Sequence, residues 1–302
     1  MDRNPSFDVI IIGGSYAGLS AAMALGRSLR KVLVIDSGKP CNAQTPHSHN
    51  FLTHDGKTPA AIAKEAKHQV LQYPTIEFFN DLATTAKQTD FGFEIVTETG
   101  KNFTSRKLII ATGVTDIMPD YKGFAECWGI SILHCPYCHG YEVKHTEIGI
   151  LANGPMGFEM GRLISNWTDK LTIFTNGIST FDEFHLEKFE EHKIKFDERE
   201  IDFFEHDKGY LKKIHFKDGT THPINAIFAR PDCQQHSEIA AQLGCDFKDD
   251  GLIQVDEFQN TSVFGVSAAG DCTTLFRSVA GAVAAGNKAG AILNRQMIEE
   301  WF

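Results

Sequence analysis

The stretch FDVIIIGGSYAGLSAA (residues 7–22) decides the fold of this chain. It begins with a short β-branched run that indicates a strand, reaches two glycines, and continues into helical composition from Ala17 to Leu29. KVLVID (31–36) follows as a second buried strand. This strand–helix–strand order predicts a parallel sheet with a crossover helix, and therefore an α/β fold.

The glycine turn between the first strand and the helix has the residue types that bind a dinucleotide. Gly13 permits the tight turn, the N–H groups at the helix start can hold a pyrophosphate, and Gly18 allows close packing. Asp36, at the end of the second strand, can accept hydrogen bonds from a ribose. Ser15 stands where glycine is expected, but it is small and its hydroxyl can face a phosphate. The predicted cofactor-binding residues here are Gly13, Gly14, Ser15, Ala17, Gly18 and Asp36.

A second strand–helix–strand unit is predicted near the middle of the chain. Its elements are EIGILA (147–152), a helix from Pro155 to Trp167, and KLTIFT (170–175). Between the two units, residues 91–113 read as a hairpin followed by the strand LIIA, which runs into a glycine turn. Two mononucleotide-binding units within 302 residues indicate two domains.

The C-terminal part of the chain adds one strand and one helix to this pattern. SVFGVSAAGD (262–271) reads as a strand that ends in Gly-Asp, and the Ala-rich stretch from Leu275 to Trp301 is long enough for a closing helix. Asp271 can serve as a helix N-cap or as a ligand at a strand end, and both roles can hold at once.

The string HCPYCHGYE (134–142) is the chemical centre of the sequence. Two intervening residues allow Cys135 and Cys138 to close a small disulfide ring, especially at a helix start. The thiolate is the nucleophile, and a neighbouring imidazolium or a helix N-terminus lowers the pKa of a thiol. His134 and His139 bracket the pair, and either can carry a proton in thiol–disulfide exchange. These four residues are the predicted catalytic group.

Two other interpretations of the Cys pair are weaker. Zinc would have to bind Cys135, Cys138, His134 and His139, whereas structural zinc sites usually draw ligands from two separated knuckles. Neighbouring residues converge on one metal only with strain, so no metal site is predicted. A reduced structural pair without chemistry is the second interpretation. The other five cysteines have no close partner in the sequence, which favours small, partly buried residues.

The composition narrows the class of protein further. A formal net charge of −10 disfavours binding to nucleic acid and to an anionic membrane. The apolar stretch Val9–Ile12 is far too short for a signal core or a membrane span. Seven scattered cysteines are not the framework of a disulfide-stapled secreted domain. A cytoplasmic location is therefore expected.

Four short motifs follow one another along nearly the whole chain: GGSYAGLSAA (13–22), ATG (111–113), CPYC (135–138) and AAGD (268–271). Their order resembles that of the low-molecular-weight thioredoxin reductases, a family of two-domain flavoproteins, and is far more specific than any one motif. The string CPYCHGYE is closer to the gliotoxin-type dithiol oxidases of that family and to their bacterial relatives.

The resemblance implies an α/β fold with two Rossmann-like nucleotide-binding domains. The FAD-binding domain would be discontinuous, formed by residues 1–116 and 247–302. The inserted NAD(P)H-type domain, residues 117–246, would carry the Cys pair. Members of the family usually form homodimers through the FAD domain, and the resemblance implies the same assembly here.

The resemblance also implies roles for individual residues around the flavin. Thr112 and Gly113 would line the segment that crosses between the domains, and Gly270 and Asp271 would bind the ribityl chain. Asn50 lies in a loop that passes the flavin ring in this family. A solvated polar loop is the other interpretation of the segment around Asn50.

The same resemblance implies different roles for the two cysteines. Cys138 would lie nearest the flavin, and Cys135 would exchange with the external thiol. In thioredoxin reductases an acid often follows the second cysteine, whereas this chain has His139. That difference leaves the identity of the proton donor open.

The second glycine turn argues against strong binding of NADPH. Ala152 stands at its first glycine position, and Pro155 removes an N–H donor from the helix start. The next strand should be followed by basic residues that grip the 2′-phosphate. NGISTFDEFHLE (176–187) has three acids and no Arg or Lys, and these acids repel a phosphate.

Three functions are compatible with the sequence. The first is an FAD-dependent thiol–disulfide oxidoreductase that acts on a thioredoxin-like protein or a small dithiol. Its electrons would pass from the dithiol to oxygen, or another donor, such as reduced ferredoxin, would reduce the disulfide. The second is a conventional NADPH-dependent thioredoxin reductase. The third is a flavin-binding redox sensor that signals through Cys135 and Cys138 without catalysis.

Overall fold

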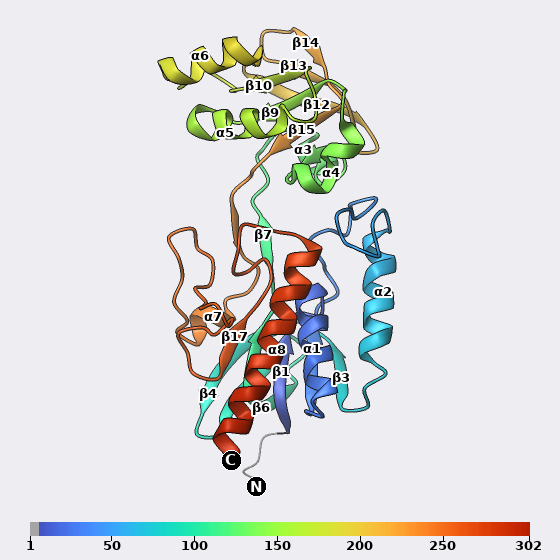
Figure 1. Cartoon of the computed structure of the whole chain (residues 1–302), viewed down its shortest axis with the longest axis vertical. Coiled ribbons are helices and arrows are strands. Elements are labelled where there is room, and N and C mark those ends of the chain that lie inside the picture. Colours follow the sequence, from blue (N-terminus) through green and yellow to red (C-terminus); the bar gives the residue numbers. More distant parts are fainter. Residues whose placement is uncertain (1–5) are drawn as a thin grey trace. The chain divides into compact units, whose positions relative to one another are not determined.

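The chain forms two compact units, which we number 1 and 2 (Figure 1). The computed structural model describes residues 6–302. Unit 1 comprises the described part of Met1–Ala43 together with Phe51–Thr115 and Cys233–Phe302, and unit 2 comprises Gln44–Asn50 and Asp116–Asp232. Unit 1 is therefore discontinuous, and most of unit 2 is an insertion into it, as the sequence predicts.

The boundaries of the units differ from the predicted ones in two places. The chain returns to unit 1 at Cys233 instead of residue 247, because β16 (Cys233–Gln235) pairs with β7 (Val114–Asp116) and the residues that follow join the core of unit 1. The short segment Gln44–Asn50 belongs to unit 2. The sequence shows no clear periodic pattern in either segment, so neither departure could be predicted.

Unit 1 is built on a seven-stranded sheet with the order β3-β2-β1-β6-β5-β4, in which β17 also pairs with β6. Its strands are β1 (Phe7–Ile12), β2 (Val32–Asp36), β3 (Ile76–Asn80), β4 (Ala83–Thr89), β5 (Gly92–Thr97), β6 (Asn102–Ile110) and β17 (Val266–Ala268). The pairs from β3 through β6 to β17 are parallel, whereas β5 is antiparallel to both β4 and β6. β1 and β2 are continuous apolar runs because both of their faces are buried.

Strand β6 is longer than the sequence predicts. The expected hairpin arm and the expected strand LIIA form one continuous strand. Its first half pairs with β5, its second half pairs with β17, and β1 pairs with most of its length. β17 covers only Val266–Ala268 of the expected strand at 262–271. Two partners thus share one strand, which a local sequence pattern cannot show.

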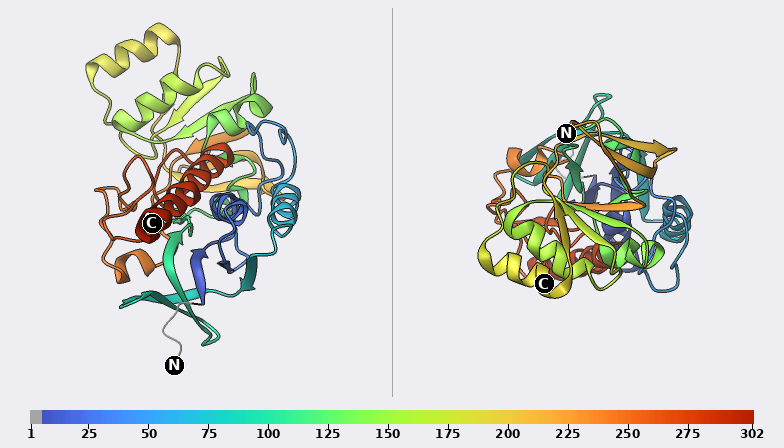
Figure 2. Two further views of the ribbon diagram at one scale, coloured as in Figure 1. Left: turned by 60° about the horizontal axis from the view of Figure 1, so that its bottom comes forward. Right: turned by 90° about the horizontal axis from the view of Figure 1, so that it is seen from above.

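Four helices belong to unit 1: α1 (Tyr16–Arg27), α2 (Pro59–Val70), α7 (Ile239–Gln242) and α8 (Val279–Trp301). Helices α1 and α8 lie side by side, as Figure 1 and the left view of Figure 2 show. They approach closely because α8 has a glycine at the contact: a Cβ on Gly286 would lie 2.0 Å from the carbonyl oxygen of Ala17. The N-cap of α8 is Ser278, which accepts a hydrogen bond from the N–H of Gly281, so Asp271 does not cap this helix.

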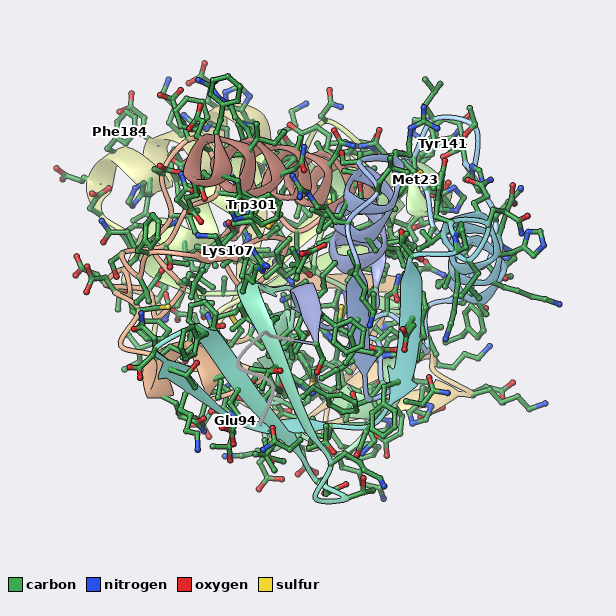
Figure 3. All side chains as sticks on the ribbon, turned by 90° about the horizontal axis from the view of Figure 1, so that it is seen from below. Met23, Glu94, Lys107, Tyr141, Phe184 and Trp301 are labelled. Carbon is green, nitrogen blue, oxygen red and sulfur yellow. The ribbon has the colours of Figure 1, made fainter. Side chains whose placement is uncertain are left out.

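The C-terminal end of α8 is anchored by charged residues (Figure 3). Lys107, buried on β6, forms an ion pair with Glu300. The ring of Trp301 receives the guanidinium groups of Arg30 and Arg106 at 4.5 and 4.7 Å from its centroid. These contacts hold the C-terminal end of α8 in place. None of the helices formed by residues 6–302 is long and apolar enough to cross a membrane.

Unit 2 contains a parallel five-stranded sheet with the order β11-β10-β9-β15-β8 and a three-stranded antiparallel sheet, β12-β13-β14. The strands are β8 (Ile132–Leu133), β9 (Ile148–Leu151), β10 (Leu171–Phe174), β11 (Lys195–Asp197), β12 (Ile201–Asp207), β13 (Tyr210–Phe216), β14 (Thr221–Pro223) and β15 (Ala226–Ala229). The helices are α3 (Phe124–Cys127), α4 (Pro136–Val143), α5 (Gly154–Ile164) and α6 (Glu183–His192). The predicted second strand–helix–strand unit is confirmed as β9, α5 and β10.

Candidate active site

Four parallel strands of unit 1 end at one edge of the sheet. Ile12 of β1 pairs with Ile35 of β2 and Ile110 of β6, and Ala268 of β17 also pairs with Ile110. Segments that follow paired parallel strands lie together, which is where α/β sheets bind nucleotides. The edge therefore collects most of the predicted cofactor-binding residues: Gly13, Gly14, Ser15, Ala17, Gly18, Asp36, Thr112, Gly113, Gly270 and Asp271.

The turn between β1 and α1 has the form of an anion cradle. Gly13 has φ +103°, and a Cβ there would lie 2.2 Å from the carbonyl oxygen of Ala111. The N–H of Gly14 donates to Asp36 Oδ1 at 2.9 Å. Ser15 is the N-cap of α1, and its side chain makes no capping hydrogen bond to any described residue. The helix start is thus left for an anion, which its dipole attracts.

Two features of the neighbouring segments fit a polar cofactor. The hydroxyl of Thr112 is buried and has no hydrogen-bond partner among the described residues, and such a group costs about 1–3 kcal/mol unless a ligand supplies one. Gly270 has φ +91°, and a Cβ there would lie 3.0 Å from the Cβ of Ala17. A side chain at Gly13 would therefore collide with the backbone of Ala111, and one at Gly270 would meet α1 at Ala17. The residues present therefore fit FAD.

Asp271 lies after β17 in a charged contact. Its Oδ2 accepts a hydrogen bond from Arg277 Nε at 3.4 Å, and Cys41 Sγ lies 3.9 Å from the same oxygen. The side chain of Arg277 is only 13% exposed and lies against this carboxylate. Asn50 is exposed, has φ +57° and belongs to unit 2.

The two cysteines of CPYC lie at the start of α4, as the sequence predicts. Cys135 is the N-cap with extended backbone angles, and Pro136 occupies the first helical position, where its fixed φ suits a helix start. One helical turn brings Cys138 back to it, so that the two Sγ atoms are 2.7 Å apart. A disulfide between them therefore needs little movement.

The surroundings make the two thiols unequal. A hydrogen bond from the Cys138 thiol, helped by the N–H groups of Cys138 and Tyr137 and by the charge of Arg230, lowers the pKa of Cys135 to about 7, against the effect of burial. The same hydrogen bond, together with burial and the negative charges of Cys135 and Glu142, raises the pKa of Cys138. These surroundings favour the thiolate on Cys135 and the protonated thiol on Cys138.

The histidines around the pair differ in what they can do. Burial, together with the nearby His49, lowers the pKa of His139 to about 4, so its ring is neutral at neutral pH. His134 directly precedes Cys135 and is half-buried. His49 also lies beside the pair, although no role is predicted for it from the sequence. Its ring centroid lies 6.3 Å from that of His139, and its Nδ1 lies 3.6 Å from Glu142 Oε1. The only signal for it was the cluster of histidines in the loop that follows β2.

The turn after β9 in unit 2 is closed by the protein itself. Asn153 caps α5: its Oδ1 accepts from the N–H groups of Gly154 and Thr180 at 2.7 and 2.9 Å, and its Nδ2 donates to the carbonyl oxygen of Ile178 at 2.9 Å. A Cβ on Gly157 would lie 3.2 Å from the ring of Phe181. The loop after β10 is thus tied across the helix start that would hold a pyrophosphate.

These features define a two-domain flavin-dependent disulfide oxidoreductase. A family model of the pyridine nucleotide-disulphide oxidoreductases matches residues 7–286, and the chain belongs to that family. The chain is 33% identical to thioredoxin reductase sirT of Leptosphaeria maculans (97% of this chain, 94% of that protein) and 34% identical to thioredoxin reductase tcpT of Claviceps purpurea (99% and 97%). The structure of an oxidoreductase from Agrobacterium tumefaciens superposes with a TM-score of 0.91 at 36% identity, over 97% of this chain and 99% of that one. The predicted resemblance is confirmed.

Proposed function

We propose that the protein is an FAD-dependent thiol–disulfide oxidoreductase in which Cys135 and Cys138 exchange electrons between an external dithiol or disulfide and the flavin. The observation that carries the proposal is the inequality of the two thiols at the start of α4. Cys135, the better nucleophile and the better leaving group, exchanges with the substrate. Cys138 keeps its proton until its sulfur forms the disulfide with Cys135. Bound FAD supplies a two-electron acceptor.

The residues collected at the sheet edge of unit 1 would hold the cofactor. The glycine turn and Asp36 would bind the adenosine side, because the N–H groups at the start of α1 face a phosphate and the carboxylate accepts from a ribose. Thr112 would supply the hydroxyl that lacks a hydrogen-bond partner within residues 6–302. Gly113, Gly270 and Asp271 would face the flavin side, and Asn50 would approach the ring from its loop.

We propose further that a dithiol substrate, and not NADPH, is the electron donor. The support is the closed turn after β9, where Asn153 Oδ1 already accepts from the N–H of Gly154 at the start of α5 and from the N–H of Thr180 in the loop after β10. The acids Asp182, Glu183 and Glu187 follow where basic residues would grip a 2′-phosphate. Oxygen would then accept the electrons and yield hydrogen peroxide. The substrate is a small dithiol or a thioredoxin-like protein.

Anaerobic reduction of the purified holoenzyme tests both parts of this proposal. We expect no bleaching of the flavin absorbance with NADPH or NADH, and fast bleaching with a dithiol such as dithiothreitol. Fast bleaching with NADPH would identify a conventional thioredoxin reductase, as the names of the fungal relatives suggest for those proteins. A flavin that no dithiol bleaches would leave the redox sensor as the function.

A cytoplasmic location and a homodimer complete the proposal. Scattered cysteines without a disulfide framework support the location. The homodimer rests on family membership alone, and sedimentation of the holoenzyme measures it directly. A monomer at micromolar concentration would overturn this part without affecting the chemistry of the Cys pair.

A further inference from the structure

The segment Gln44–Asn50 packs with unit 2, although the chain on both sides of it belongs to unit 1. A Cβ on Gly129 would lie 2.9 Å from the hydroxyl of Thr45, and Ser48 is buried. The segment therefore runs closely along this unit instead of extending into solvent. It brings His49 to helix α4, which carries the Cys pair.

His49 meets the face of α4 on which Cys138 lies. Cys138 and Glu142 are four residues apart in the helix and so share one face. His49 Nδ1 lies 3.6 Å from Glu142 Oε1, which is an ion-pair distance when the imidazole is protonated, and its ring meets the edge of the His139 ring at 88°. His47, the other titratable neighbour, lies 6.3 Å away between ring centroids.

Only one of the two rings at this face is suited to hold a proton. His139 is half-buried, and desolvation lowers its pKa to about 4, so its neutral ring can pass a proton between its nitrogens but does not keep one at neutral pH. The side chain of His49 is 20% exposed, which gives it access to water, and the carboxylate of Glu142 compensates its positive charge.

We propose that His49, held by Glu142, stores the proton that Cys138 takes up and gives up, with the neutral ring of His139 as the link between them. The inference rests on the proposed function. His49 and Glu142 are positioning residues, because they act on the sulfur through His139.

The proposed step balances in atoms and electrons. A substrate thiol gives its proton to His49, and its sulfur attacks Cys135 Sγ. The Cys135–Cys138 disulfide breaks, its bonding electrons leave on Cys138, and that sulfur takes the proton from His49 through His139. The second substrate thiol then loses its proton to water, its sulfur attacks the first substrate sulfur, and Cys135 leaves as a thiolate, which yields a substrate disulfide and a reduced pair.

The test is the pH profile of flavin bleaching by dithiothreitol, measured by anaerobic rapid mixing of the holoenzyme. We expect H49Q to slow bleaching about 10- to 100-fold at neutral pH and to change the pH profile of the rate. E142Q should slow bleaching less. The matched control is H215Q, which breaks a His–Glu pair on β12 and β13 with Nε2 2.7 Å from Glu205 Oε2, and it should keep the wild-type profile.

An unchanged rate and profile in H49Q would overturn the inference. If H49Q does not fold with bound flavin, E142Q decides alone, because it replaces a partly exposed carboxylate with an amide of the same shape. E142Q with a wild-type profile would then overturn it. Wild-type enzyme that dithiothreitol cannot bleach would instead refute the proposed function, on which the inference depends.

Discussion

At the scale of single residues, chemistry follows from what surrounds each side chain. Cys135 and Cys138 are the same residue type one helical turn apart, yet a single hydrogen bond between them shifts their pKa values in opposite directions. His139 is adjacent in sequence, but burial keeps its ring neutral. The identity of a residue thus sets which reaction is available, and its environment decides which partner performs each step.

Alkylation of the reduced enzyme should report the lowered pKa of Cys135. We expect the rate with iodoacetamide to rise with pH, to reach half of its maximum at about pH 7, and then to level off, because only the thiolate reacts. Mass spectrometry should find the label on Cys135. In C138A the thiol donor is lost, so the midpoint should move to higher pH; an unmoved midpoint would show that this hydrogen bond is not the cause.

Replacement of Asp36 should weaken the binding of FAD. D36A removes the acceptor of the Gly14 N–H and the predicted partner of the ribose. A lost hydrogen bond to a charged group is worth about 1.5–3 kcal/mol, so we expect a dissociation constant on the order of 10- to 100-fold higher. Equilibrium release of flavin fluorescence measures it. The control is D246A, which replaces an exposed acid in the same unit and should bind FAD as tightly as the wild type does.

At the scale of elements, the N-terminus of each helix determines what that helix can bind, and glycine contacts determine how closely helices pack. The start of α1 is open, the start of α4 carries the Cys pair, and the start of α5 is capped by Asn153. The N-terminus of a helix therefore has three different roles in this chain. The residue at the N-cap decides among them, because it either uses the N–H groups of the first turn or leaves them for a ligand.

The contact between α1 and α8 should tolerate no side chain at its closest point. In G286A the new methyl group would meet the backbone of Ala17 at 2.0 Å. We expect a loss of about 1–3 kcal/mol in the free energy of unfolding, which exceeds the gain in helix propensity. Chemical denaturation measures it. N287A changes the exposed neighbour and should be close to neutral; equal stability of both variants would contradict the packing argument.

At the scale of the whole molecule, flavin binding and thiol chemistry belong to different units. The residues predicted to hold FAD lie in unit 1, except for Asn50, and the Cys pair lies in unit 2. Turnover needs both, whereas binding of the cofactor needs mainly the first. Variants should therefore separate the two functions cleanly.

The variant C138S makes this separation measurable. We expect normal flavin content and a normal melting temperature, because no residue of the sheet edge in unit 1 changes. Dithiol turnover, followed as oxygen consumption, should be abolished, because no disulfide can form with Cys135. C127S, at a cysteine of α3 with no predicted role, tests whether loss of any thiol has this effect. Full activity of C138S would refute the proposed mechanism.

The sequence by itself determined the α/β class, the glycine turn after β1 and the Cys pair at a helix start, because each depends on residues within a few positions of one another. It also indicated that the second nucleotide turn is altered. Only the tertiary structure showed that Asn153 and the loop after β10 close this turn, and that His49 lies beside Glu142 and His139. Such contacts join segments far apart in the chain, and packing of the whole unit, which no local pattern records, decides which of them form.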